Sequence, residues 1–193
     1  LVFTRIRTLS TLTPEVTLSP GVIDMVNELN INTWTSDVMF SSQRQSWETP
    51  WPLFNELNKE FQFTLDAAAS KENTKCEHYI TKEMDSLSQS WNDLSLGGSV
   101  WLNPPYGRSI GSWIEKASIE SSIGCSVVVL TFCRTDTKWW NRYAMRAAEI
   151  RLIPGRIKFV GANSSAPAPS CLLIFDESRR LPRFKTQVLP RRE

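Results

Sequence analysis

The sequence predicts an α/β fold with a mainly parallel β-sheet. Short apolar segments rich in β-branched residues alternate along the chain with segments whose apolar residues recur at helical spacing. The clearest strand, residues 126–132, is apolar on both faces, which is typical of a parallel sheet covered on both sides. Strands that alternate with helices therefore favour a sheet packed between helical layers.

The helices are predicted from their first residues and from their apolar periodicity. Ser19-Pro20 and Thr49-Pro50 are each suited to open a helix, because proline fits the first helical turn. Ser109 is suited to cap a third helix that ends near Gly124. The expected helices cover residues 20–29, 50–61, 110–123 and about 136–148, the last of them rich in Trp and Arg.

Short apolar segments between the helices predict the strands. The first strand ends in Asp66, before a turn of small residues, and the third stops at Asn103-Pro104-Pro105. The last two strands flank a loop rich in Pro, Ser and Gly, so we expect them to form an antiparallel hairpin. The predicted strands are residues 61–65, 76–80, 100–102, 126–132, 150–153, 157–160 and 171–175.

The composition is that of a globular protein without a metal centre. Hydrophobic residues make up 41% and charged residues 22% of the 193 residues, which indicates one well-buried domain. The longest uninterrupted apolar stretch, residues 127–130, is too short to cross a membrane, and no secretory signal follows Arg5 and Arg7. One histidine, His78, and four scattered cysteines match neither a zinc site nor a redox pair, so we expect reduced thiols in a cytoplasmic protein.

Basic residues are concentrated toward the C-terminal end of the chain. Residues 134–193 carry 13 basic and 5 acidic side chains, a net charge of +8, whereas residues 1–48 and 49–133 have net charges of −2 and −4. A basic surface of this kind favours binding to a phosphate backbone. A surface that merely keeps the protein in solution accounts for the charge equally well.

The motif Asn103-Pro104-Pro105-Tyr106 follows a predicted strand, at the sheet edge where open α/β folds bind ligands. The two prolines remove two backbone donors and fix the chain, while Asn103 adds a side-chain acceptor. An exocyclic amine offers two N–H donors, which an amide oxygen and a backbone carbonyl can hold together. Tyr106 offers a flat face on which a base can stack. The motif therefore predicts transfer to an amine by positioning, without a covalent intermediate; the alternative is a rigid loop that only ends a strand.

Several blocks of sequence, in the same order, closely resemble phage and prophage DNA adenine-N6 methyltransferases. The resemblance covers roughly residues 41–177 and omits the first forty. Several separate blocks are more specific than the Asn103 motif alone. They are residues 41–42, 47–50, 53–58, 61–69, 101–107, 134–140, 155–159 and 166–170.

The resemblance implies a Rossmann-like S-adenosylmethionine-dependent methyltransferase domain at residues 41–177. This domain is expected to hold a mostly parallel seven-stranded sheet with a final antiparallel hairpin. Residues 1–40 are then an N-terminal extension, and residues 178–193 are a basic, flexible tail. The implied reaction methylates N6 of adenine in double-stranded DNA after base flipping, in the cytoplasm of a bacterial host, with neither a metal nor a membrane involved.

The resemblance also implies which residues hold the cofactor. Thr49 and Pro50 match the block that lies against the methionine end, and Asp66 is expected near the methionine amino group. Ala67 and Ala68 complete the first-strand motif, Asn103 lies beside the cofactor, and Asp85 is expected to accept from the cofactor's adenine amine. An ordinary surface carboxylate explains Asp85 equally well. The sequence departs from the common pattern because no glycine follows Asp66, and Ala69 and Ser70 stand there instead.

Cations and aromatic residues in the last third of the chain are expected to contact the DNA. Arg134 and Lys138 follow the strongest strand and are expected to contact the backbone, as are Arg156 and Lys158. The aromatic residues are expected to support an extruded base, in contrast to Trp140, whose helical spacing favours a core position. They are Trp139 and Phe159, the latter stacking opposite Tyr106.

Three alternatives stay open from the residues themselves. Methylation of cytosine N4 poses the same chemical problem as methylation of adenine N6. A protein glutamine methyltransferase would share the Asn-Pro-Pro-Tyr core, although the basic C-terminal part disfavours a protein substrate. A non-catalytic nucleic-acid-binding module with the same fold would account for the glycine-free loop after Asp66.

Overall fold

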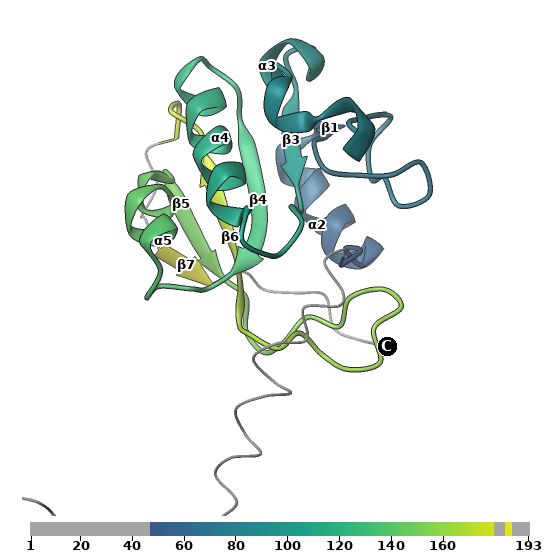
Figure 1. Ribbon diagram of the computed structural model, residues 1–193, viewed down its shortest axis with the longest axis vertical. Helices are drawn as coiled ribbons and strands as arrows, with labels where there is room; N and C mark the ends of the chain where they lie inside the picture. Colours follow the sequence, from purple (N-terminus) through teal and green to yellow (C-terminus); the bar gives the residue numbers. More distant parts are fainter. Residues whose placement is uncertain (1–46, 180–183, 187–193) are drawn as a thin grey trace, which may run out of the picture. The chain divides into compact units, whose positions relative to one another are not determined.

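The computed structural model describes residues 47–179 and 184–186 (Figure 1). The predicted helix at residues 20–29 lies outside the described residues. Three 3₁₀ turns, η2 (Lys82–Met84), η3 (Ser86–Ser88) and η4 (Ala144–Arg146), separate some of the larger elements. Those elements are α2 (Trp51–Phe61), β1 (Phe63–Asp66), β2 (His78–Tyr79), α3 (Trp91–Leu94), β3 (Ser99–Leu102), α4 (Ile110–Ser122), β4 (Val127–Phe132), α5 (Lys138–Arg142), β5 (Glu149–Leu152), β6 (Ser170–Phe175) and β7 (Phe184–Thr186).

The strands form one sheet in the order β2-β1-β3-β4-β6-β5-β7. Strand β1 pairs in parallel with β2 and β3, β3 pairs in parallel with β4, and β5 pairs in parallel with β7. Strand β6 is antiparallel to both β4 and β5, so it alone among the described strands runs in the reverse direction. The predicted mixed α/β fold with a mostly parallel sheet is therefore confirmed.

Helices cover both faces of the sheet, with α4 and α5 on one side and α2 on the other (Figure 1). Strand β4 shows why, because all six of its residues are buried. Val127 and Val129 pack toward α4, whereas Val128 and Leu130 belong to the core formed with α2. Alternate residues of a strand point to opposite faces, so a strand that is buried along its whole length requires cover on both sides.

Helix α2 delivers the chain into β1. It begins after Pro50, with proline also in its first turn, and buries its apolar face. It ends at Phe61, and the C-cap residue Gln62 adopts the left-handed conformation with φ 52°, while the Asn58 side chain accepts a hydrogen bond from the Phe63 amide at 2.7 Å. These caps end the helix one residue before the first strand.

Three expectations about the last third of the chain need correction. Residues 157–160 are not a strand. Among the described residues, their β-type pairing is limited to an isolated bridge between Val160 and Glu48. The antiparallel partner of β6 is β5 instead. Ile157 and Phe159 alternate like strand residues because both side chains are buried against the core while the backbone forms a loop. The single helix expected at 136–148 breaks at Tyr143 into α5 and η4.

Part of the expected tail is also structured, because Phe184–Thr186 forms β7 beside β5. Within the described residues, no helix is long and apolar enough to span a membrane. The same residues contain no group of three or more His, Cys, Asp or Glu side chains placed to hold a metal ion. The four cysteines form no disulfide.

An ion-pair network joins α2 to β5, and it is buried at its β5 end and exposed at Glu60 on α2. The Arg151 guanidinium donates to both oxygens of Glu60 at 2.6 Å and to Glu149 at 2.8 Å. Arg179 adds a contact to the same Glu60 carboxylate at 2.8 Å. Glu149 is 0% exposed, so its charge depends on these partners. The guanidinium of Arg151 holds the pKa of Glu60 down at about 2.

Candidate active site

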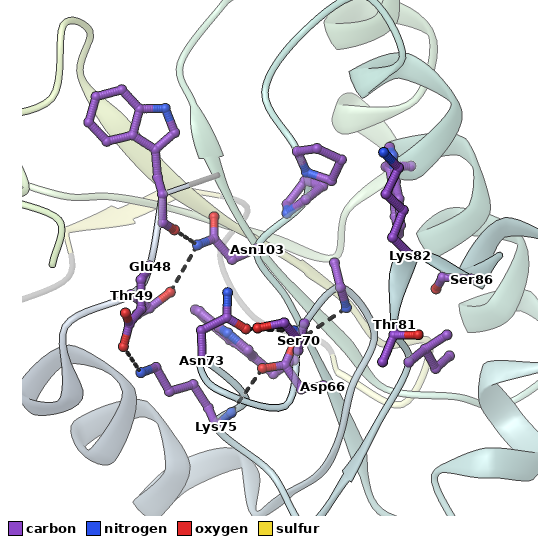
Figure 2. Close-up of a pocket in the computed structure, with 18 of the residues that line it drawn as sticks. Glu48, Thr49, Asp66, Ser70, Asn73, Lys75, Thr81, Lys82, Ser86 and Asn103 are labelled. Carbon is purple, nitrogen blue, oxygen red and sulfur yellow. Dashed lines mark hydrogen bonds and ion pairs between the residues drawn. The ribbon is translucent and has the colours of Figure 1, made fainter. Parts of the chain in front are cut away.

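A cavity of about 610 Å³ lies where β1 and β3 end side by side (Figure 2). The chain runs from β1 to β2 on one side and then crosses to β3 on the other. Open α/β sheets bind ligands at such a switch point, beyond the carboxyl ends of the strands. Most of the lining comes from four segments, residues 47–49, 66–75, 80–87 and 103–105.

Asn103 lines this cavity, and its side-chain amide forms hydrogen bonds through its nitrogen end. Its Nδ2 donates to the Trp47 carbonyl oxygen and to Thr49 Oγ1, the latter at 3.1 Å. A carbonyl only accepts hydrogen bonds, so this contact identifies the nitrogen end of the amide. Oδ1 is out of contact with solvent and has no hydrogen-bond partner among the described residues. The site therefore contains a fixed hydrogen-bond acceptor, Asn103 Oδ1, that lacks a donor. Buried acceptors are rarely left unpaired in proteins, so a bound ligand is expected to supply the donor.

The two prolines that follow also line the cavity, but Tyr106 does not. Tyr106 donates its hydroxyl to the Leu130 carbonyl at 3.3 Å, and its ring centroid lies 4.3 Å from that of Phe132. Burial raises the pKa of the Tyr106 hydroxyl well above its ordinary value. Pro104 and Pro105 thus line the cavity, whereas Tyr106 is partly buried and packs against the core.

Asp66 supplies the buried carboxylate of the site. It ends β1, is 3% exposed, and accepts a hydrogen bond from the Lys75 amide at 3.0 Å and one from the Ala68 amide at 3.4 Å. Burial nevertheless raises the pKa of Asp66 to about 6, because two backbone donors only partly offset the desolvation of the charge. This carboxylate is poised to gain from a cationic ligand.

The glycine-free loop after Asp66 contains no strained residue. Ala67, Ala68, Ala69 and Ser70 are not among the described residues with positive φ, so the loop does not need the conformation that glycine alone adopts readily. Ala68 lines the cavity, but Ala67 is fully buried and faces the core. The Ala67 amide donates to the Trp101 carbonyl at 2.9 Å, which ties β1 to β3.

Asp85 lines another part of the cavity and is exposed. It adopts a left-handed conformation, φ 49°, between η2 and η3. Its neighbour Ser86 is buried and donates to the Ala67 carbonyl at 2.6 Å, and Trp91 donates to the Ser86 carbonyl at 3.0 Å. Aspartate adopts this conformation more readily than most residues, and here Asp85 caps η2, with its amide donating to the Lys82 carbonyl. Its place in the cavity lining is compatible with the expected role at the cofactor.

The structure changes the expectation for Phe159. This residue is 1% exposed, and its ring packs against Trp47 with the centroids 5.3 Å apart. It does not line the cavity. A ring enclosed in this way has no free face for a base, so the prediction that Phe159 stacks on the substrate is corrected to a core position.

The other residues expected at the DNA lie outside the cavity. Trp139 is partly buried and packs against α4, where a Cβ built on Gly111 would lie 3.1 Å from its Cβ. Trp140 is in the core, as its spacing predicted. The four cations are exposed: Arg134, Lys138, Arg156, which donates to the Ala166 carbonyl at 3.2 Å, and Lys158.

Sequence reasoning missed two further cations beside the expected ones. Arg142 and Arg146 lie over the Tyr143 ring, 5.3 and 5.7 Å from its centroid. With Arg134 and Lys138 they recur at every fourth position, and all four are exposed. Within the described part of the chain, none of the four forms an ion pair with a carboxylate. The spacing itself was visible in the sequence.

Sequence reasoning also missed the polar loop that closes the cavity between β1 and β2. The Lys75 ammonium pairs with Glu48 at 2.9 Å, and the Ser70 amide donates to Asn73 Oδ1 at 2.7 Å (Figure 2). Lys75 thereby links the loop that holds Asp66 to the segment that holds Thr49. The side chains that line the cavity and were not predicted include Trp47, Glu48, Ser70, Asn73, Lys75, Thr81, Lys82 and Ser86.

Two phage proteins are similar in sequence to this chain. A DNA N-6-adenine-methyltransferase of Haemophilus phage HP1 is 29% identical over 143 residues, which cover 70% of this chain and 80% of the phage protein. A DNA N-6-adenine-methyltransferase of Escherichia phage T1 is 32% identical over 108 residues, which cover 55% of this chain and 44% of the phage protein.

The fold and its cavity are consistent with a methyltransferase. The family model described as DNA N-6-adenine-methyltransferase (Dam) matches residues 36–189. The chain belongs to this family, and the resemblance noted from the sequence is confirmed.

Proposed function

We propose that this protein methylates N6 of adenine in DNA, and that the cavity between β1 and β3 is its active site. The observation that carries the proposal is the orientation of Asn103, which lines the cavity and whose Oδ1 is left without a partner among the described residues. An acceptor fixed in this way suits an amine that arrives with its own N–H donors. Family membership favours adenine N6 over cytosine N4, a protein glutamine or a non-catalytic role.

The residues of the cavity fit S-adenosylmethionine, the methyl donor that the family implies. A cavity of about 610 Å³ is within the range of about 300–1,000 Å³ common for small-molecule sites. The buried Asp66 carboxylate suits the ammonium group of the methionine part, beside Thr49 and Pro50. Asp85, from a different segment of the lining, suits the amine of the adenine part. When bound, the cofactor supplies a methyl group on a positively charged sulfur.

The chain's own residues act by holding the target amine. Asn103 Oδ1 accepts one N–H, and a backbone carbonyl of the Asn103-Pro104-Pro105 turn accepts the other, because the prolines offer no competing N–H. With both hydrogens held, the nitrogen lone pair turns out of the ring plane toward the methyl group. After transfer the amine loses one proton to solvent. No strong base is required, and positioning of this kind lowers the barrier substantially.

We infer a Rossmann-like domain that spans residues 41–177, with residues 1–40 as an extension. Its support is the crossing of the chain between β1 and β3, with Asp66 and Asn103 at the two strand ends. The seven-stranded sheet then includes β7, which extends the domain beyond residue 177. We expect the enzyme to act in the cytoplasm of a bacterial host.

For the DNA-facing surface we propose the exposed cations near this edge. Arg134 and Lys138 follow β4, and Arg142 and Arg146 continue the row along α5 and η4. Like charges four residues apart destabilise a helix slightly. These four cations therefore do not serve the stability of the fold, and binding to a polyanionic partner explains them better. Phosphate contacts orient a duplex without reading its sequence. Arg156 and Lys158 are proposed to add contacts from the loop before β6.

Nucleoside analysis tests the proposed function. Unmethylated DNA is incubated with the protein and S-adenosylmethionine, digested to nucleosides and analysed by mass spectrometry. We expect the digest to contain N6-methyl-2′-deoxyadenosine. The Asn103→Ala variant should produce none of this nucleoside. N4-methylcytosine, or methyl transfer to protein alone, would refute adenine as the target, and cofactor binding without any transfer would support the non-catalytic alternative.

A further inference from the structure

We propose that the side-chain ammonium of Lys75 binds the carboxylate of the methionine part of S-adenosylmethionine. The inference rests on the proposed function, because it concerns the cofactor that the proposed reaction requires. The methionine part carries an ammonium group and a carboxylate on the same carbon atom. Asp66 is the proposed partner of the ammonium group, so the carboxylate needs a cationic partner of its own.

Lys75 presents a buried ammonium group to the cavity. The residue lines the cavity, and its side chain is only 2% exposed. Its backbone amide donates to Asp66 Oδ2 at 3.0 Å (Figure 2). The residue that touches the buried carboxylate through its backbone therefore also carries a cation, and such a pair suits a ligand with opposite charges on neighbouring groups.

The Lys75 ammonium has more donors than the described residues use. It has three N–H donors, and among the described residues it donates to Glu48 at 2.9 Å and to no other acceptor. The Trp51 ring lies on another side, with its centroid 4.2 Å from Nζ. Burial of a charge is costly unless hydrogen bonds replace its water. A carboxylate bound in the cavity would accept the remaining hydrogen bonds.

The charges of this part of the cavity lining complement those of the cofactor. The two carboxylates of Glu48 and Asp66 and the one ammonium of Lys75 sum to a net charge of −1 when all are ionised. S-adenosylmethionine carries two cationic groups, the ammonium and the sulfonium, and a single carboxylate. Without Lys75, that carboxylate would lie near two acids and lose its proposed partner.

The experiment compares two ligands, S-adenosylmethionine and its decarboxylated form, which keeps both cationic groups but lacks the carboxylate. Calorimetry measures both dissociation constants for the wild type, Lys75→Met and a matched control, Lys82→Met. Lys82 also lines the cavity, but it is exposed. We expect the wild type to prefer S-adenosylmethionine about 10- to 100-fold, the range for one charge-assisted hydrogen bond. Lys75→Met should lose this preference by binding S-adenosylmethionine more weakly, and Lys82→Met should keep it.

Two further variants separate recognition of the ligand from folding. Glu48→Gln breaks the ion pair but leaves the Lys75 ammonium in place, so it should keep the preference for S-adenosylmethionine. Lys75→Gln removes the charge but can still donate a hydrogen bond to Glu48, so it provides the same test if Lys75→Met does not fold. Circular dichroism checks the folded state of each variant.

A wild type that binds the two ligands equally would overturn the proposal, as would a preference that survives in Lys75→Met or Lys75→Gln. Equal loss of affinity for both ligands in these variants would also overturn it, because Lys75 would then act structurally. Each of these results leaves adenine methylation intact. A wild type that binds neither ligand would refute the cofactor site and this inference together, whereas methylation of a base other than adenine would refute only the proposed function.

Discussion

Asn103 Nδ2 lies 3.1 Å from Thr49 Oγ1, so a residue 54 positions earlier in the chain helps to set which end of the Asn103 amide is paired and which is left without a partner among the described residues. Thr49 is buried, so no water replaces its hydroxyl readily. The contact joins the segment before α2 to the turn after β3. The chemistry assigned to Asn103 therefore depends on Thr49 as well.

Replacing Thr49 with Val should lower the turnover number about 2- to 12-fold, which corresponds to the loss of one hydrogen bond. The size of the side chain is nearly unchanged, so the fold should persist. Thr49→Ser keeps the hydroxyl and should retain most activity. Steady-state kinetics of both variants provide the test, and full activity in Thr49→Val would show that the Trp47 carbonyl alone orients the amide.

Replacing Asp66 with Ala should raise the dissociation constant of S-adenosylmethionine about 10- to 100-fold, because a charge-assisted hydrogen bond to the cofactor's ammonium group is lost. Calorimetry measures the affinity, and circular dichroism checks that the fold is intact. If the affinity does not change, the carboxylate at the end of β1 is not the cofactor's partner.

Cofactor affinity should also depend on pH through Asp66. The pKa of this carboxyl is raised to about 6, so it becomes protonated, and loses its attraction for an ammonium group, as the pH falls below that value. We expect the dissociation constant to rise with acidification between about pH 7 and about pH 5, and Asp66→Asn to remove this dependence. For stability the sign is the opposite: the buried carboxyl contributes most when it is protonated, and this contribution is lost as the pH rises from the ordinary value of 3.8 through about 6. A pH-independent affinity in the wild type would contradict the assignment.

Replacing Arg151 with Met should lower the free energy of unfolding by about 3–5 kcal/mol, because it removes the guanidinium that neutralises the buried Glu149 carboxylate. The matched control is Lys59→Met, which breaks the exposed pair with Glu56 and should change stability by less than about 1 kcal/mol. Urea unfolding monitored by circular dichroism measures both. Equal effects in the two variants would mean that the network at β5 contributes no more than a surface pair.

Changing Lys138, Arg142 or Lys158 to Gln should each flatten the dependence of log affinity for duplex DNA on log salt by about 0.9, because one phosphate contact is lost. Lys59→Gln, on α2, should leave the slope unchanged. Salt titrations on one oligonucleotide of unrelated sequence are sufficient, since phosphate contacts do not depend on sequence. Unchanged slopes in all three variants would move the DNA-facing surface to another part of the molecule.

The sequence was sufficient for the features that depend on local chemistry. The buried strand β4, the proline-initiated helix α2 and the acid at the end of β1 each follow from a short pattern. The position of Asn103 beside the carboxylate strand follows from topology, because parallel strands bring their carboxyl ends to one edge. The fold class, and the position of Asp66 and Asn103 at one edge of the sheet, were therefore predictable.

What the sequence could not provide depends on contacts between distant segments. Alternating apolar residues at 157 and 159 resemble a strand, but both are buried from a loop whose isolated β-bridge joins Val160 to Glu48. Trp47 and Lys75 acquire their positions through partners far along the chain, respectively Asn103 and Glu48. No periodicity within a segment reports such contacts.

The most direct test of this account is the rate of methyl transfer in Asn103→Ala. The variant removes the unpartnered Oδ1 acceptor and should lower single-turnover methylation of adenine on the order of 10²-fold or more, the size of effect seen when one positioned hydrogen-bonding group is removed from a transition state. Cofactor affinity, measured by calorimetry on the same preparation, should fall much less. Near-normal methylation in Asn103→Ala, with the cofactor bound and the fold intact, would contradict the assignment of this cavity as the site that holds the amine.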